Sequence, residues 1–89
     1  MTTQDFLELL ENGPFAWPGG YPMFFICADG GVISFDAAEE RKAEILEAIK
    51  EPRSNQQWEV IASDVNWEDA DLYCDHTNER IISAYAETE

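Results

Sequence analysis

The chain carries nineteen acidic side chains against five basic ones, and this imbalance constrains the folds open to it. A net charge of -14 on 89 residues makes the folded chain repel itself. A chain of this length buries only about 60–65% of its unfolded surface, so its core must be small. Hydrophobic residues at 45% and aromatic residues at 12% are still too abundant for a charged disordered tail. We expect one folded domain over residues 1–89.

The acidic side chains are unevenly placed along the chain. Between Ser54 and Glu79 there is no Lys or Arg. The seven carboxylates of this segment belong to Glu59, Asp64, Glu68, Asp69, Asp71, Asp75 and Glu79. A strongly negative field attracts basic partners and repels nucleic acid and anionic lipid. The charge pattern therefore favours a binding protein over an enzyme.

The first part of the chain predicts a short helix followed by a hairpin. Thr2 or Thr3 caps the helix, which stops at an Asn-Gly-Pro sequence. Strands are expected at 21–28 and 32–35, joined by a turn at 29–31.

The clearest predicted element is an amphipathic helix over 36–51, which begins at Asp36 and ends at Pro52. Its apolar face carries Ala38, Ile45 and Ile49, with Leu46 at the edge. The opposite face, which we call the helix ridge, carries Glu40, Glu44, Glu47 and Glu51. At a rise of ~1.5 Å per residue, the helix ridge would be about 16 Å long.

The remaining sequence predicts a strand at 57–63, an irregular acidic segment at 64–75 and a last strand at 81–85. The predicted fold class is therefore α+β: a small antiparallel sheet with one long amphipathic helix packed on it and a short N-terminal helix.

Aromatic residues supply much of the predicted core. We expect the side chains of Phe15, Trp17, Tyr21, Phe24 and Phe25 to fill the core rather than to line a ligand groove. Trp67 lies among acidic residues instead and is the better candidate for an exposed anchor.

The motifs for metal binding and catalysis are sparse. Cys74 and His76 form a Cys-x-His pair and Cys27 is a third possible ligand, but structural zinc usually requires two close pairs. We expect that the chain binds no metal and no cofactor, and a zinc site is the alternative. The two cysteines should be reduced, one of them buried and the other half-exposed, and His76 should lie at the surface. There is no phosphate-binding loop and no His-Glu-x-x-His, so no catalytic residue is assigned. A small hydrolase or transferase that uses clustered carboxylates and His76 is the weaker hypothesis.

The chain shows no sign of a targeting or membrane segment. Its first residues lack the basic and apolar regions of a signal peptide. No run approaches the roughly 20 apolar residues of a membrane span. We therefore expect a cytoplasmic protein.

Two blocks of the sequence resemble small phage and prophage proteins. The first block contains Gly20-Tyr21-Pro22 and Asp29-Gly30-Gly31-Val32. The second runs from Trp67 to His76 and continues through Glu79-Arg80-Ile81 and Ser83-Ala84-Tyr85. The resemblance implies a mobile-element origin and no known activity.

The resemblance also implies a degenerate metal site. In these phage proteins one Cys-x-x-Cys follows the Gly-Gly turn and a second begins at the position of Cys74, which implies a zinc-ribbon-like core. The corresponding positions here are Ser34, Ala37, Cys74 and Thr77, so three of the four ligands are missing.

Together these patterns predict a non-enzymatic, phage-type binding protein that inhibits a host nucleic-acid-binding defence complex. It would act like an anti-CRISPR or anti-restriction protein, because an acidic, DNA-mimicking surface can occupy the Lys and Arg arrays that grip phosphates. The predicted partner-binding residues are Glu40, Glu44, Glu47, Glu51, Asp64, Trp67, Glu68, Asp69, Asp71 and Asp75. The partner is a basic protein surface, not nucleic acid or a membrane. The alternatives are a structural or regulatory phage module of zinc-ribbon descent that acts by protein–protein contacts, and charge that serves solubility alone.

Overall fold

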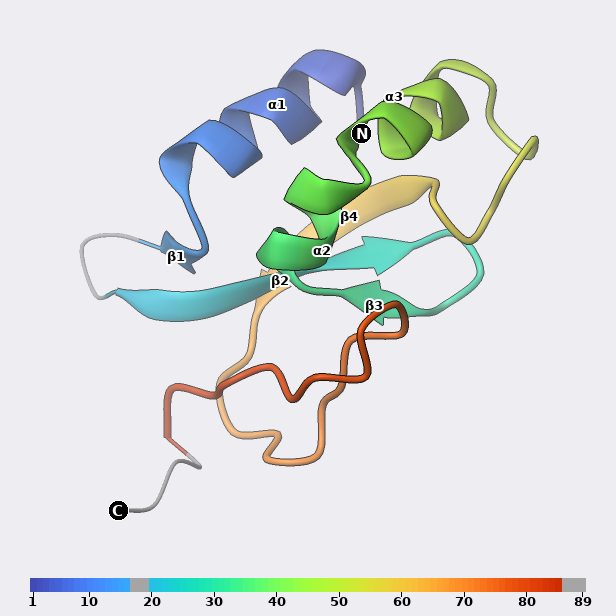
Figure 1. Cartoon of the computed structure of the whole chain (residues 1–89). Coiled ribbons are helices and arrows are strands. Elements are labelled where there is room, and N and C mark those ends of the chain that lie inside the picture. Colours follow the sequence, from blue (N-terminus) through green and yellow to red (C-terminus); the bar gives the residue numbers. More distant parts are fainter. Residues whose placement is uncertain (17–19, 86–89) are drawn as a thin grey trace.

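The computed structural model describes residues 1–16 and 20–85 and confirms an α+β fold with an antiparallel sheet (Figure 1). In chain order its elements are α1 (Thr3–Asn12), β1 (Phe15–Ala16), β2 (Tyr21–Cys27), β3 (Val32–Ile33), α2 (Phe35–Glu40), α3 (Lys42–Lys50) and β4 (Val60–Val65).

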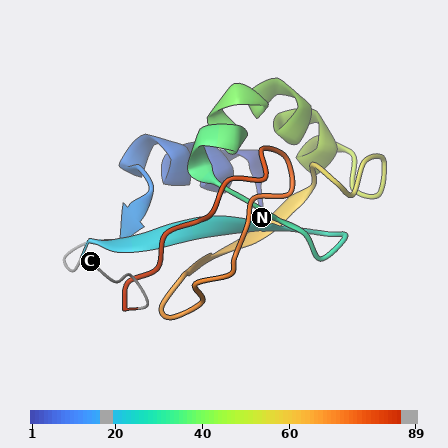
Figure 2. The same ribbon diagram turned by 60° about the horizontal axis from the view of Figure 1, so that its bottom comes forward.

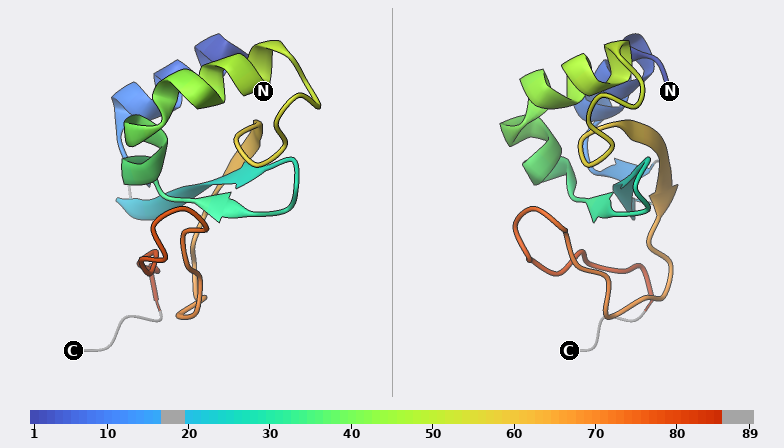
Figure 3. Two further views of the ribbon diagram at one scale, coloured as in Figure 1. Left: turned by 45° about the vertical axis from the view of Figure 1, so that its right-hand side comes forward. Right: turned by 90° about the vertical axis from the view of Figure 1, so that its right-hand side faces the viewer.

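The sheet is organised around β2, which pairs with the other three strands. Along β4 the pairing runs from Met23 opposite Val65 to Cys27 opposite Val60, with an irregularity between Ile26 and Cys27. Strands β1 and β3 pair with the beginning and the end of β2, respectively. Helices α1 and α3 lie on one side of the sheet, and the chain after β4 lies on the opposite side (Figure 3).

The first helix forms as its sequence predicts. Thr2 is the N-cap: its hydroxyl accepts the N–H of Asp5 at 3.1 Å, and the Asp5 carboxylate accepts the N–H of Thr2 at 3.2 Å. Gly13 ends the helix at a φ of 89°, a conformation that glycine adopts without strain. The buried ring of Phe6 then packs against Phe25 of β2, with 5.2 Å between ring centroids.

The prediction of one long helix is wrong, because two helices meet at Arg41. The first begins earlier than predicted: Ser34, not Asp36, is the N-cap, and its hydroxyl accepts the N–H of Ala37 at 3.1 Å. This start also shortens the returning strand to β3 and places Phe35 against Phe25, where their rings stack at 4.3 Å. At Arg41 the backbone leaves helical geometry, with φ -108° and ψ 27°.

The apolar face of this helical region agrees with the prediction. Ala38, Ile45 and Ile49 are buried, and Leu46 is half-buried against the same core. The 3.6-residue period therefore continues across Arg41 closely enough for both helices to cover one core.

The predicted strand at 57–63 is displaced, since β4 begins at Val60, although Trp58 before it is buried. The last predicted strand at 81–85 is wrong. The backbone carbonyls of Ile81 and Ile82 accept hydrogen bonds from the side chain of Asn66 and so do not join a strand ladder. Figure 2 brings forward residues 72–85, which we call the C-terminal segment, and shows a loop of this segment reaching toward α2.

The aromatic core is smaller than predicted. Phe25 is fully buried, while Tyr21 and Phe24 are half-buried. Phe15 is 39% exposed on the short strand β1, so its assignment to the core is wrong. Trp17 lies outside the described residues.

Candidate partner-binding surface

An exposed acidic segment begins within the last two residues of β4 and continues beyond it, and we call residues 64–71 the acidic segment. Its exposed, predicted partner-binding residues are Asp64, Trp67, Glu68, Asp69 and Asp71. Asp64 pairs with Phe24, the neighbour of Phe25 in β2. Because successive side chains of a strand point to opposite faces, Asp64 lies on the face away from α1.

The acidic segment is held in place by Asn66, which is only 3% exposed. Its side-chain amide donates to the carbonyls of Asp69, Ile81 and Ile82 at 3.0–3.1 Å, and its side-chain oxygen accepts the N–H of Asp69 at 3.1 Å. Its backbone N–H donates to the carbonyl of Pro22, and its own carbonyl accepts from Ala84. Asn66 thus joins the acidic segment to β2 through its backbone N–H and to the C-terminal segment through its side chain.

The four glutamates of the helix ridge lie on two helices instead of one. Glu40 ends α2, while Glu44 and Glu47 lie on α3 and Glu51 caps its end. All four side chains are exposed, but Glu44 pairs with Arg41 at 3.5 Å and Glu40 lies 4.0 Å from His76. Residues 40–53 also hold four bases beside these four acids, so this region carries no net formal charge.

The two predicted acidic regions do not share a face. Helix α3 lies on one side of the sheet and the acidic segment on the other in both views of Figure 3. Asp75, the last residue of the predicted 64–75 segment, lies apart from residues 64–71: it lies beside Gly31 in the turn after β2, and its N–H donates to the carbonyl of Val32 at 2.9 Å. A single flat partner cannot contact all the predicted residues at once.

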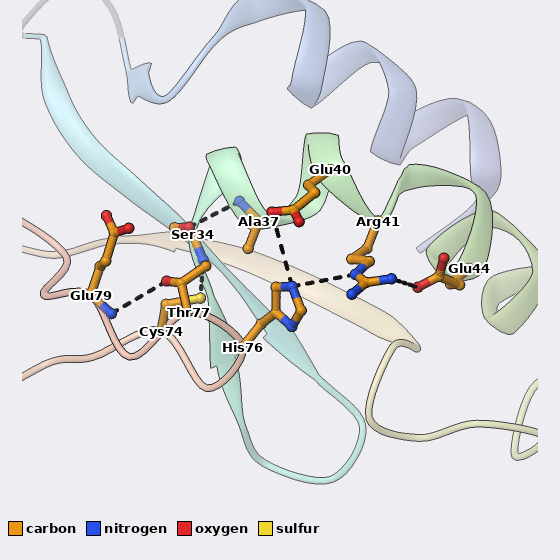
Figure 4. Close-up of polar contacts among 9 residues, drawn as sticks. All are labelled: Ser34, Ala37, Glu40, Arg41, Glu44, Cys74, His76, Thr77 and Glu79. Carbon is orange, nitrogen blue, oxygen red and sulfur yellow. Dashed lines mark hydrogen bonds and ion pairs between the residues drawn. The ribbon is translucent and has the colours of Figure 1, made fainter.

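Cys74 lies at the junction of β3, α2 and the C-terminal segment (Figure 4). Its sulfur accepts the N–H of Ser34 at 3.4 Å and further hydrogen bonds from Thr77 and His76. Burial opposes ionisation of this thiol, but these hydrogen bonds outweigh it, so the pKa of Cys74 lies below its ordinary value. The prediction of one half-exposed cysteine is wrong, because this packing buries Cys74 as fully as Cys27.

Cys27 is the opposite case, because burial, followed by the charges of Asp29 and Asp75, raises its pKa from 9.0 to about 12. The folded chain therefore keeps this proton where the unfolded chain has lost it, and the unfolded state binds fewer protons between those pH values. We expect stability to fall as the pH rises from 9.0 toward 12. In Cys27→Ala this loss should be smaller, as measured by urea midpoints across that range; equal losses in both proteins would contradict the assignment.

His76 is half-buried rather than at the surface, and its ring meets Trp58 edge-on at 5.0 Å. Its Nε2 accepts a hydrogen bond from the Arg41 guanidinium at 3.3 Å (Figure 4). The carboxylate nearest to it belongs to Glu40 and is exposed. This arrangement joins the C-terminal segment to the junction of α2 and α3.

Within residues 1–16 and 20–85, no group of three or more His, Cys, Asp or Glu side chains could hold a metal ion. The four positions that the resemblance assigns to a zinc site are nevertheless adjacent. Ser34 bonds to Cys74 through its N–H and to Ala37 through its hydroxyl, and Thr77 bonds to Cys74. The residues present do not fit a zinc ion, because only one of the four carries a sulfur.

An aromatic cluster beside the acidic segment was only partly predicted. Trp67, assigned from the sequence as an exposed anchor, is 45% exposed. Its ring lies 4.6 Å from that of Tyr21 and 6.0 Å from that of Tyr85. Tyr21 was assigned to the core and Tyr85 to a strand, and only the path of the C-terminal segment brings them together.

Comparison of the chain with protein-family models, with curated proteins and with solved structures found no match. In the described part of the chain, no helix is long and apolar enough to cross a membrane.

Proposed function

We propose that this chain is a non-enzymatic binding protein whose acidic segment occupies the basic, nucleic-acid-binding surface of another protein. One observation carries the proposal. Residues 54–79 contain seven carboxylates and no Lys or Arg, and four of those carboxylates are exposed together in the acidic segment. A surface of this kind presents fixed negative charge to a Lys and Arg array as a phosphate backbone does.

The structure also narrows the proposed binding surface. The helix ridge is interleaved with bases and lies on the other side of the sheet, so we leave it out of the contact. The acidic segment keeps its charge and is fixed to the fold through Asn66. A fixed surface loses less conformational entropy on binding than a disordered acidic tail.

The concrete form of this proposal is a phage-type inhibitor of a host defence complex that grips nucleic acid, acting in the host cytoplasm. The resemblance to phage proteins supports this form, because mobile elements gain from blocking such complexes. The proposal includes no catalytic residue and no cofactor.

Displacement of DNA tests the proposal. Purified restriction and CRISPR effector complexes, each loaded with a short fluorescent duplex, would be titrated with the chain. We expect release of the duplex from at least one complex, with an apparent affinity that weakens as salt is raised, because the contact is electrostatic. Retention of the duplex by every complex would contradict the inhibitor, and salt-insensitive release would contradict the electrostatic contact.

A second candidate is a structural or regulatory module of zinc-ribbon descent. The observation that favours it is that Ser34 and Thr77 both hydrogen-bond to the Cys74 sulfur, while the N–H of Ala37 donates to the Ser34 hydroxyl. The triple variant Ser34→Cys, Ala37→Cys, Thr77→Cys would restore four thiols at these positions. Descent from a ribbon predicts that the variant binds Co²⁺ with the absorption spectrum of a tetrahedral thiolate site. A variant that folds but gives no such spectrum would count against this candidate.

A further inference from the structure

Three aromatic rings gather at the edge of the acidic segment and define an aromatic cluster of Tyr21, Trp67 and Tyr85. The rings of Trp67 and Tyr85 are nearly parallel, at 13° between their planes, while Tyr21 is tilted by 53° against Trp67. Trp67 is 45% exposed and Tyr85 is 65% exposed. Exposed aromatic rings beside one another are typical of an interaction site, because their apolar surface gains most by burial in a partner.

The aromatic cluster is held by the backbone and not only by ring contacts. The N–H of Tyr85 donates to the carbonyl of Trp67 at 2.8 Å, one residue beyond the bond between Ala84 and Asn66. A hydrogen bond with Tyr21 is the largest cause of the raised pKa of Tyr85. The rings are therefore positioned before any partner binds, which lowers the entropic cost of binding.

Carboxylates lie next to Trp67 in the chain. Glu68 follows Trp67 in the chain, and its charge also raises the pKa of Tyr85, so this carboxylate lies close to the rings. Asp64 and Asp69 are exposed on either side of Trp67 in the same segment. This charge disfavours stacking of a nucleobase, whose phosphates would be repelled, and favours a cation on the ring faces.

We propose that the aromatic cluster anchors an arginine side chain of the basic partner. A guanidinium is planar, so it can stack on the ring of Trp67 or Tyr85 while its N–H groups donate to a carboxylate such as that of Glu68. A lysine ammonium is more strongly hydrated and lacks the planar fork, so it uses the carboxylates and gains less from the rings. The inference rests on the proposed function and names the partner group at that surface.

Two peptides of equal charge, nona-arginine and nona-lysine, separate the aromatic contact from the acidic one. Affinity for each would be measured by calorimetry for the native chain and for Trp67→Leu. Tyr73→Leu is the matched control, since Tyr73 is 49% exposed and forms no part of the aromatic cluster. We expect the native chain to bind nona-arginine more tightly than nona-lysine. Trp67→Leu should lower the affinity for nona-arginine by about three- to tenfold and leave the affinity for nona-lysine nearly unchanged. Tyr73→Leu should retain the full preference.

The outcomes distinguish the two proposals. Nona-arginine affinity that is unchanged in Trp67→Leu would overturn the arginine site while leaving the acidic surface in place. Equal losses for both peptides in Trp67→Leu would also overturn it, because the ring would then have no role specific to arginine. Failure of both peptides to bind the native chain at about 20 mM salt would contradict the proposed function itself. Tyr85→Ala offers a second variant, and it should reduce the preference for nona-arginine in the same direction.

Discussion

Replacing Asn66 with alanine is expected to lower the free energy of unfolding by about 3 kcal/mol, a large share of the stability of so small a domain. The side chain is buried and satisfies three carbonyls and one N–H. Alanine would remove all four hydrogen bonds, and the carbonyl of Ile81, whose bond to Asn66 is buried, would be left unsatisfied at a cost of about 1–3 kcal/mol. Urea unfolding followed by circular dichroism measures the change.

Two further variants test whether the loss of stability comes from the hydrogen bonds of Asn66. One keeps the volume of the side chain, and the other is a control at an exposed asparagine. Asn66→Asp preserves the shape of the side chain but turns a carboxylate toward three carbonyl oxygens, so we expect at least the same destabilisation at neutral pH. Asn55→Ala changes the same residue type at an exposed position and should stay within about 0.5 kcal/mol of the native chain. A well-tolerated Asn66→Asp would show that Asn66 does not hold the C-terminal segment through its amide.

Neutralising the acidic segment is expected to weaken binding of nona-lysine at low salt by about 30-fold. The variant combines Asp64→Asn, Glu68→Gln, Asp69→Asn and Asp71→Asn. Each substitution keeps the size of the side chain and removes one charge, and an exposed ion pair contributes about 0.5 kcal/mol. Four such contacts correspond to about 2 kcal/mol, which is about 30-fold in affinity.

A matched variant removes the same number of charges from the other side of the sheet. It combines Glu40→Gln, Glu44→Gln, Glu47→Gln and Glu51→Gln. Its net charge equals that of the first variant, so a general effect of the field would weaken both equally. We expect a loss of less than about threefold, because these glutamates lie beside an equal number of bases. A larger loss here than in the acidic-segment variant would place the contact on α3.

Local sequence signals predicted the elements whose causes are themselves local. The threonines at positions 2 and 3, of which Thr2 is the cap, and the Asn-Gly-Pro sequence predicted the two ends of the first helix. The apolar period of Ala38, Ile45 and Ile49 identified the helical face that is buried. Each of these signals depends on residues within a few positions of one another.

The errors arise where distant residues compete with local preference. Asp36 and Glu39 form a good helix start by themselves, but Ser34 becomes the cap, since that start places Phe35 on Phe25. Asn66 acts on carbonyls fifteen and sixteen residues away, and no local pattern could show that it would replace a strand.

The candidate site was predictable in composition but not in arrangement. The absence of Lys and Arg between Ser54 and Glu79 and the exposure of Trp67 follow from the sequence and its acidic context. The separation of the helix ridge from the acidic segment could not be predicted from the sequence, because it depends on the side of the sheet on which each segment packs. The contribution of Tyr21 and Tyr85 depends on the same tertiary path.

The most direct test of the central claim is amide chemical-shift mapping of the ¹⁵N-labelled chain during titration with nona-lysine at low salt. We expect the largest shifts in the acidic segment, at residues 64–71, and nearly unchanged amide shifts in α3. Largest shifts on α3, or uniform small shifts over the whole surface, would contradict a defined acidic binding face.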